Sequence, residues 1–380
     1  MLLYTAVIFL STLLFFVGDN SSNAFVKKIF VILSILISSF FAGFRDATVS
    51  IDAVAYGVPI FDHICRALSY GNIVDLFNEA SIGGGAYAKI ESGYLLLNIV
   101  AASVSNSINV LFFILQFAAL LLVVYGISLF KEDVRNGTIV YFLYNLFFYC
   151  ASFCFLRQSI VMALLFVICY YLIKREIVPY MFLCVVAFFF HHSAIILIPL
   201  YFIPNMVRVI PRYYQPLLLL FGLSLYYVFP LIIPFLSANG IIDARFAKYA
   251  NMSYQVHKID MLFYLLLYFL AFFCGKRLQN RIMMDSFEYV KNAKALSIIG
   301  LCMTLCGIYN DVASRMAMYV VPTIIYSFLM LETKSCNRCK FGSINRISFA
   351  LILIFVLYYV YKGAVTGFGI VPYKSKILGL

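Results

Sequence analysis

Charged residues are scarce in this sequence. Asp, Glu, Lys and Arg make up 12% of its 380 residues, about half of the roughly 25% that soluble domains carry. Hydrophobic residues make up 64%, and the mean hydropathy is +0.98. A chain of this composition cannot cover a water-facing surface, so lipid must solvate most of it. The composition therefore predicts an integral membrane protein.

Several familiar catalytic and binding motifs are absent as well. The sequence has no GxxxxGK phosphate loop, no serine nucleophile elbow and no separate hydrophilic domain that would bind a nucleotide sugar. Cys336 and Cys339 form a single CxxC pair, whereas a zinc site needs two more ligands. We therefore expect no metal and no cofactor, and the energy for any reaction must come from the substrate or from a gradient.

The net charge of +12 does not indicate a nucleic-acid partner. The 28 Lys and Arg residues are scattered through the gaps between apolar runs and form no continuous basic stripe. This distribution is what the positive-inside rule produces in membrane proteins. Most of the ten cysteines lie inside apolar runs, where we expect them to act as small core residues.

Apolar runs that are long enough to cross a bilayer, or nearly so, occur at ten places. They are Leu2–Val17, Phe25–Gly43, Ile108–Phe130, Thr138–Phe155, Ser159–Ile173, Tyr214–Leu236, Met261–Cys274, Ala295–Tyr309, Met316–Leu331 and Ile347–Tyr361. The first has no basic leader and no small-x-small cleavage site after it, so we expect a retained membrane helix.

Basic residues predict which gaps face the cytoplasm. Gly275–Lys294 holds five of them and Glu332–Arg346 holds four. Successive gaps must alternate between the two sides of the membrane, which requires that Ile177–Ile203 cross the membrane twice and turn near His191 and His192. Its two short helices could alternatively be re-entrant. Ser92–Ser105 must not span, and we expect it to lie in the membrane interface as an amphipathic helix.

These considerations predict an all-α fold, a polytopic transmembrane bundle of about 10–12 spanning helices with both termini outside. Residues 1–380 form a single membrane domain in this scheme. A long outer loop covers residues 44–91 and contains three successive glycines, and a second outer loop covers residues 237–259.

Several ionisable side chains come to the predicted outer face, at or near helix ends. They are Arg45, Asp46, Glu91, Arg157, His191, Asp311 and Arg315. Each has an ordinary explanation, such as an arginine reaching lipid headgroups, a packed neutral histidine or an acid at a helix start. Their convergence on one face nevertheless predicts a functional site, because ionisable groups at the membrane edge are costly. Three arginines with carboxylates and a histidine suit a phosphorylated, acidic substrate.

The motifs around these residues resemble those of EpsG-like, Wzy-type polysaccharide polymerases. Gly43–Asp52 followed by Tyr56 is similar to the family's GFRD..VGTD...Y element, and Glu91–Tyr94 is similar to its Glu-Pro-Gly-Phe/Tyr element. The same holds, in order, for Arg157-Gln158-Ser159-Ile160, for Phe190-His191-His192-Ser193-Ala194, for Ser314-Arg315-Met316 with Tyr319, and for the closing Val371–Lys374. The sequence departs from the pattern at Ser50, Ile51 and Ser92, which replace Gly, Thr and Pro.

The resemblance implies a glycosyltransferase of the GT-C type in the bacterial inner membrane. Such an enzyme joins oligosaccharide repeats carried on undecaprenyl diphosphate into O-antigen or a related surface polysaccharide, capsule or exopolysaccharide, at the periplasmic face. It also implies a partner protein that regulates chain length. Arginines that bind the diphosphate would make a metal ion unnecessary, so we expect a metal-independent reaction. An O-antigen ligase and a lipid-linked oligosaccharide flippase or transporter are the alternatives.

The resemblance and the charges together assign provisional roles. Arg157 and Arg315, supported by Arg45, are expected to bind the diphosphate. The general base is Glu91 or His191, with Asp52 or Asp46 behind them. The expected supporting residues are Asp46, Gln158, Asp311, Tyr56 and Tyr319.

Overall fold

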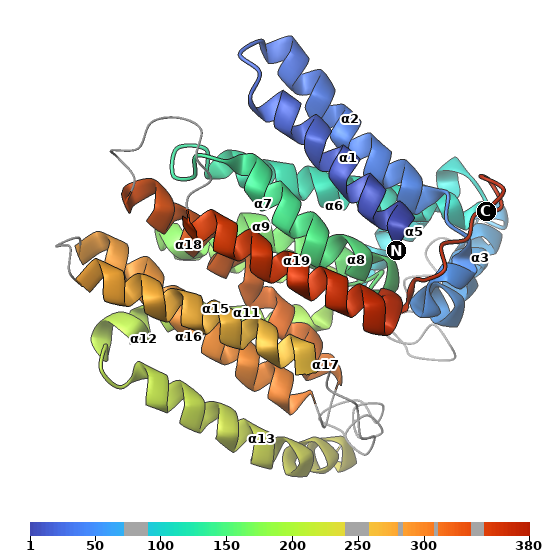
Figure 1. Cartoon of the computed structure of the whole chain (residues 1–380). Helices are drawn as coiled ribbons and strands as arrows, with labels where there is room; N and C mark the ends of the chain where they lie inside the picture. The colour runs from blue at the N-terminus through green and yellow to red at the C-terminus, as the bar shows by residue number, and fades with distance from the viewer. Residues whose placement is uncertain (72–89, 240–257, 280–283, 308–310, 336–345) are drawn as a thin grey trace. The chain divides into compact units, whose positions relative to one another are not determined.

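The computed structural model describes residues 1–71, 90–239, 258–279, 284–307, 311–335 and 346–380 (Figure 1). All regular elements in these ranges are helices. This agrees with the predicted all-α class, because a helix satisfies its own backbone hydrogen bonds and therefore suits a lipid environment. Contacts divide the chain into two compact units, which are described separately.

Unit 1 comprises Met1–Lys131, Asn136–Ile195 and Tyr359–Leu380. Its helices are α1 (Leu2–Asp19), α2 (Ala24–Gly43), α3 (Val58–Ser69), α5 (Ser92–Val104), α6 (Ile108–Leu129), α7 (Gly137–Tyr144), α8 (Cys150–Cys154), α9 (Ser159–Lys174) and α10 (Ile177–Phe190). A π-helix, η3 (Asn145–Tyr149), joins α7 to α8, so that Gly137–Cys154 is one apolar segment of 18 residues.

The helices of unit 1 have the alternating directions that the charge pattern predicts. At one end, the side-chain amide of Asn109, at the start of α6, donates to the carbonyl of Arg45, just after α2. At the opposite end, Lys27 pairs with Asp19 at 3.4 Å, near the start of α7. The predicted outer residue Arg45 belongs to the first end, and Lys27, which the charge pattern predicts to be cytoplasmic, belongs to the second.

The predicted outer loop 44–91 contains more regular structure than the sequence indicated. It holds the short turns η1 (Ala47–Val49) and η2 (Ala53–Gly57), and then the amphipathic helix α3. Pro59 lies in the first turn of α3, where its missing N–H costs no hydrogen bond. The three glycines of this loop lie outside the described residues, as does most of the second predicted loop.

The break near His191 is confirmed. α10 ends at Phe190, His191 has an extended backbone, and the 3-10 turn η4 (His192–Ile196) follows. The segment Ser92–Ser105 also forms the predicted helix, α5, whose buried face includes Tyr94, Leu95 and Asn98. The crossing of the bilayer by the two halves of Ile177–Ile203 stays a prediction.

Unit 2 comprises Glu132–Arg135 and Ile196–Tyr358. It contains α11 (Leu197–Leu200), α12 (Ile203–Val209), α13 (Tyr214–Ala238), α15 (Lys258–Gln279), α16 (Met284–Cys306), α17 (Asp311–Met316), η5 (Ala317–Val320) and α18 (Val321–Ser335). The last helix, α19 (Arg346–Thr366), begins in unit 2 and ends in unit 1.

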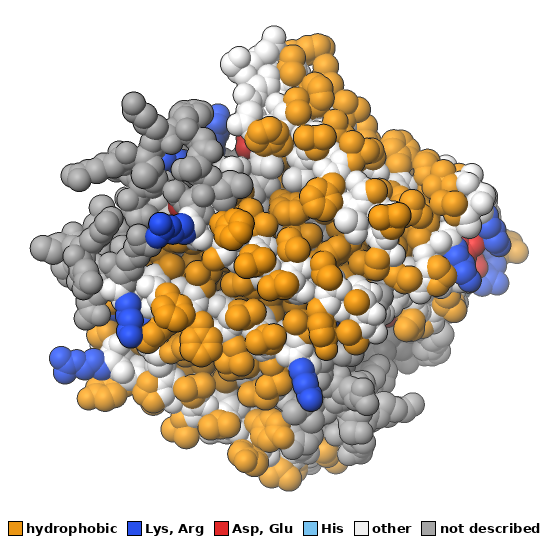
Figure 2. All heavy atoms as spheres, viewed as in Figure 1, with side chains coloured by type: hydrophobic (Ala, Val, Ile, Leu, Met, Phe, Trp, Pro, Cys, Tyr) orange, Lys and Arg blue, Asp and Glu red, His pale blue; other side chains and the backbone are white. Residues whose placement is uncertain are grey.

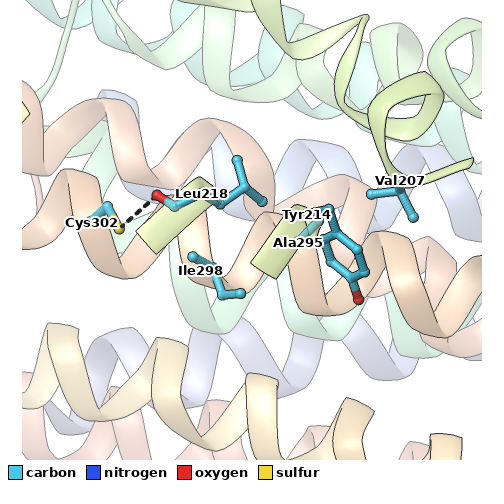
Figure 3. Packing of buried hydrophobic residues seen from close by; sticks show 6 residues of the cluster. All are labelled: Val207, Tyr214, Leu218, Ala295, Ile298 and Cys302. Carbon is cyan, nitrogen blue, oxygen red and sulfur yellow. Dashed lines mark hydrogen bonds between the residues drawn. The ribbon is translucent and has the colours of Figure 1, made fainter. Parts of the chain in front are cut away.

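A packed cluster in unit 2 shows why the cysteines act as small core residues (Figure 3). Cys302 on α16 lies against α13, where its thiol is 4.0 Å from the carbonyl oxygen of Leu218. A β-carbon at Gly222 would overlap the Cys302 sulfur, so a glycine is needed for this close helix contact. Val207, Tyr214, Ala295 and Ile298 complete the buried cluster.

The surface of the described residues is dominated by apolar side chains. Figure 2 shows hydrophobic atoms over most of one face, with a few isolated groups of Lys and Arg. Eight described helices, or groups of consecutive helices, are long and apolar enough to cross a membrane. The chain is therefore a multi-pass membrane protein.

Candidate active site

The Glu91 carboxylate lies at the centre of a cluster of ionisable side chains in unit 1. Glu91 immediately precedes α5, and its side chain is only 3% exposed. A terminal nitrogen of Arg157 donates to Oε2 at 3.1 Å, and Nδ1 of His191 lies 2.9 Å from Oε1. Arg157 and His191 therefore both contact the Glu91 carboxylate, although they lie 66 and 100 positions from Glu91 in the sequence. Each of the three residues is also predicted separately from the sequence.

The electrostatics of this cluster keep Glu91 ionised. Burial alone would raise the pKa of its carboxyl, but the hydrogen bond from His191 and the charge of Arg157 outweigh burial and lower the pKa to about 2. Burial acts to lower the pKa of Arg157, but the charge and hydrogen bond of Glu91 together with the interactions of Tyr56 outweigh burial, so that the net shift is upward. Glu91 is therefore a fixed anion and a weak base near neutral pH.

Tyr56 and Asp52 extend the cluster on the other side of Arg157. The guanidinium carbon of Arg157 lies 4.7 Å from the centre of the Tyr56 ring, a cation–π contact. The Tyr56 hydroxyl donates to Asp52 Oδ2 at 2.6 Å. Burial, followed by the nearby Asp52 charge, raises the pKa of Tyr56. Arg157 is thus held between a carboxylate and an aromatic ring.

Two glycines permit the close approach of the segments that carry this cluster. A β-carbon at Gly93 would lie 2.9 Å from the carbonyl oxygen of Phe189, two residues before His191. One at Gly57 would lie 2.9 Å from the Leu156 side chain, next to Arg157. The role of these two glycines cannot be identified from the sequence alone, because that role depends on contacts between segments that are distant in the sequence.

Arg45 lies in a different environment from Arg157. It is 3% exposed, and its guanidinium is stacked between the rings of Phe112 and Phe153 at 4.0 and 4.3 Å. Burial lowers the pKa of Arg45 to about 10, so it remains charged at neutral pH. Among the described residues Arg45 has no hydrogen bond or ion pair with Glu91, and Phe153, which it contacts, lies four residues before Arg157.

Comparison with known proteins adds one positive finding. The family model described as the EpsG family matches residues 28–375, which is nearly the whole chain. The chain belongs to the EpsG family. No curated protein and no solved structure matches it. Membership of this family indicates an enzyme of the polysaccharide-polymerase, glycosyltransferase type.

The remaining predicted site residues of this EpsG family chain lie outside the Glu91 contacts. Asp46 caps η1 by accepting hydrogen bonds from Thr48, which lower the pKa of its carboxyl, and Lys376 lies 3.8 Å away. Gln158 is buried beside Arg157. Arg315 and Tyr319 belong to unit 2, on α17 and η5 respectively.

The backbone of α17 and η5 is fixed partly by α15. The Tyr264 hydroxyl donates to the carbonyl oxygen of Ala317 at 2.6 Å, two residues after Arg315. Tyr319 is 2% exposed and acts as a core residue of unit 2. The side chain of Asp311, the first residue of α17, lies outside the described part, as do Cys336 and Cys339.

The cluster is suited to acid–base chemistry on an anionic substrate. No group of three His, Cys, Asp or Glu side chains that would hold a metal occurs among the described residues. If His191 is neutral with its proton on Nδ1, that proton points at Glu91 and Nε2 is left as an acceptor. His191 is 21% exposed and Arg157 is 30% exposed, so both side chains remain partly accessible.

Proposed function

We propose that the protein polymerises oligosaccharide repeats carried on undecaprenyl diphosphate into O-antigen or a related surface polysaccharide. The reaction takes place at the periplasmic face of the bacterial inner membrane. The observation that carries the proposal is the Glu91–Arg157–His191 cluster, which combines a phosphate-binding cation with an oriented imidazole at the predicted outer end of unit 1. Family membership supports the polymerase type of chemistry.

The proposed step is a displacement at the anomeric carbon of the donor glycan. The hydroxyl oxygen at the non-reducing end of an incoming repeat forms a bond to this carbon. The bond between the carbon and the diphosphate oxygen breaks, and undecaprenyl diphosphate leaves with the electron pair. The hydroxyl proton passes to Nε2 of His191.

His191 rather than Glu91 is the general base in this proposal. A carboxylate with a pKa of about 2 accepts a proton poorly near neutral pH. Glu91 instead orients the ring through Nδ1 and stabilises the imidazolium that forms after proton transfer, the arrangement of a carboxylate–histidine pair. Glu91 is therefore a positioning residue, and His191 contacts the reacting hydroxyl.

Arg157 binds the diphosphate and stabilises the charge that develops as the lipid diphosphate departs. Its Nε is buried and has no hydrogen-bond acceptor among the described residues. Glu91 and the Tyr56 ring fix the guanidinium before substrate arrives, which lowers the cost of ordering it on binding. Arg315 is the second proposed diphosphate ligand. The reaction needs no metal in this scheme, and a separate membrane protein regulates chain length.

A complementation experiment tests the proposal. A deletion strain would carry wild type, Arg157→Ala, His191→Ala, Arg315→Ala or Lys131→Ala, the last being an exposed basic residue as control. Membrane amounts of each variant would be matched, and surface polysaccharide separated on a gel. We expect a ladder with wild type and Lys131→Ala, and a single capped repeat with the site variants.

Other outcomes would replace the proposal. Loss of even the single repeat in the deletion strain would indicate a flippase or a ligase. A normal ladder from well-expressed Arg157→Ala and His191→Ala variants would place the chemistry elsewhere in the chain.

A further inference from the structure

Two lysines of unit 2, one near the end of α15 and one about midway along α16, contact the same aromatic ring. Nζ of Lys276 lies 4.9 Å from the centre of the Phe272 ring, and Nζ of Lys294 lies 5.1 Å from the same centre. The two ammonium groups are therefore no further apart than these two distances together. Both ammonium groups therefore contact the ring of Phe272 from two different helices.

Neither ammonium has a carboxylate partner among the side chains that the structure describes. The described residues place no Asp or Glu within ion-pair distance of Lys276 or Lys294. Glu288, in the first turns of α16, is occupied by Arg208, whose guanidinium nitrogens donate to its two oxygens at 2.8 and 2.7 Å. The positive charge of the lysine pair is therefore uncompensated by the described protein.

The environment of Lys294 makes this lack of compensation costly. Its side chain is half-buried, and burial lowers its pKa. A β-carbon at Gly275 would lie 3.3 Å from Nζ of Lys294, so the glycine leaves the space that the ammonium occupies. A cation–π contact is weak at a partly exposed site. An anion at this position would compensate the charge of the half-buried Lys294 ammonium.

We propose that Lys276 and Lys294, with Phe272 between them, bind the phosphate group of an anionic phospholipid. The location fits this ligand, since Lys276 ends an apolar helix that is long enough to cross a membrane, and both lysines belong to the gap Gly275–Lys294, whose basic residues predict the cytoplasmic side. Basic clusters at this depth attract anionic headgroups through charge, and the acyl chains cover the apolar helix surface. The site is separate from the Glu91 cluster and does not depend on the proposed function.

Lipid retention by the purified full-length chain tests the site. The protein would be placed in nanodiscs or detergent with phosphatidylglycerol or with phosphatidylcholine, and bound lipid counted by native mass spectrometry. Wild type, Lys276→Gln/Lys294→Gln and the control Lys28→Gln/Lys131→Gln carry the same chemical change at different places. We expect the first double variant to retain phosphatidylglycerol roughly tenfold less than wild type, and the control to match wild type.

Thermal unfolding distinguishes a phospholipid ligand from free inorganic phosphate, and it also shows whether each variant is folded. Phosphatidylglycerol, but not phosphatidylcholine or millimolar inorganic phosphate, is expected to raise the Tm of wild type more than that of Lys276→Gln/Lys294→Gln. Equal phosphatidylglycerol retention by wild type and this variant would overturn the site. An equal Tm rise with inorganic phosphate alone would overturn the lipid assignment.

Discussion

Replacing Glu91 by Gln tests the proposed roles of Glu91, which orients His191, and of His191, which accepts the proton. The substitution keeps the size of the side chain but removes the anion that Arg157 and His191 share. The amide can no longer stabilise an imidazolium, and it can present either an oxygen or an NH₂ group to Nδ1 of His191. A comparable change of the orienting carboxylate in a serine protease lowers kcat about ten-thousandfold. We expect polymerisation by Glu91→Gln to fall at least a hundredfold, with a smaller effect on substrate binding.

The same substitution has a calculable effect on stability. The pKa of Glu91 is lowered from 4.5 to about 2, which corresponds to about 3 kcal/mol of stabilisation near neutral pH. A depressed carboxyl pKa stabilises the folded state above the unfolded pKa, and the contribution is lost as the pH falls from about 4.5 towards 2. Arg157 is 30% exposed and recovers some hydration when its partner is lost, so we expect a net loss of about 1–3 kcal/mol.

The assay is the initial rate of glycan polymerisation by purified protein across pH 5 to 9, with unfolding followed in the same detergent. The Glu91 carboxylate, with a pKa of about 2, stays ionised throughout this range. We therefore expect Glu91→Gln to be slower than wild type at every pH, with Glu288→Gln as a matched control that behaves like wild type. A Glu91→Gln variant with normal kcat would refute the proposed pairing of Glu91 with His191.

Three further substitutions probe how the site is supported. Gly93→Ala places a methyl group against the carbonyl of Phe189 and should lower the polymerisation rate about tenfold with little change in membrane amount, and a normal rate would show that the approach of α5 to α10 is adjustable. Arg45→Ala removes a guanidinium stacked between two rings and should lower the free energy of unfolding by about 1–3 kcal/mol, measured by thermal unfolding, whereas an unchanged Tm with lost substrate binding would favour a direct contact with the diphosphate. Truncation after Thr366 removes Phe368 and Gly369, whose carbonyl oxygens lie 3.2 and 3.8 Å from the Cys154 sulfur, and should increase maleimide labelling of Cys154; unchanged labelling would contradict this packing.

The C-terminal segment after α19 makes contacts near the candidate site that could not be predicted from the sequence. Its last residues contain little regular structure, yet the Tyr373 hydroxyl donates to the carbonyl of Phe41 at 2.9 Å, and the amide of Asp46 donates to the carbonyl of Lys374 at 2.8 Å. The Tyr4 hydroxyl donates to the carbonyl of Ile370 at 2.8 Å. These contacts join the two ends of the chain, and neither hydropathy nor local propensity carries information about such pairings.

The membrane helices and the break at His191 were predictable because they depend on local composition. Apolar runs of bilayer length specify helices wherever lipid is the solvent. The polar His191–His192 pair interrupts such a run, and the structure ends α10 there. The helix α3 was missed because its apolar residues Ile60, Phe61 and Ile64 occupy one face of a short segment that also contains Pro59 and charges.

The membership of the site was only partly predictable. Charge and motif order singled out Glu91, Arg157 and His191, because ionisable residues are rare in this chain and stand out at helix ends. They did not reveal which residues touch. The pairing of Tyr56 with both Asp52 and Arg157, and the separate stacking of Arg45, follow from how η2, α6 and α8 pack.

The central claim is that this chain forms glycosidic bonds between lipid-linked repeats. Purified protein in nanodiscs would be incubated with a single undecaprenyl-diphosphate-linked repeat, and the products analysed by mass spectrometry. We predict a series of glycans that differ by one repeat, each still on lipid diphosphate, and one undecaprenyl diphosphate released for every bond formed. Unchanged single repeats with wild-type protein, under conditions where the repeat is shown to bind, would contradict the claim.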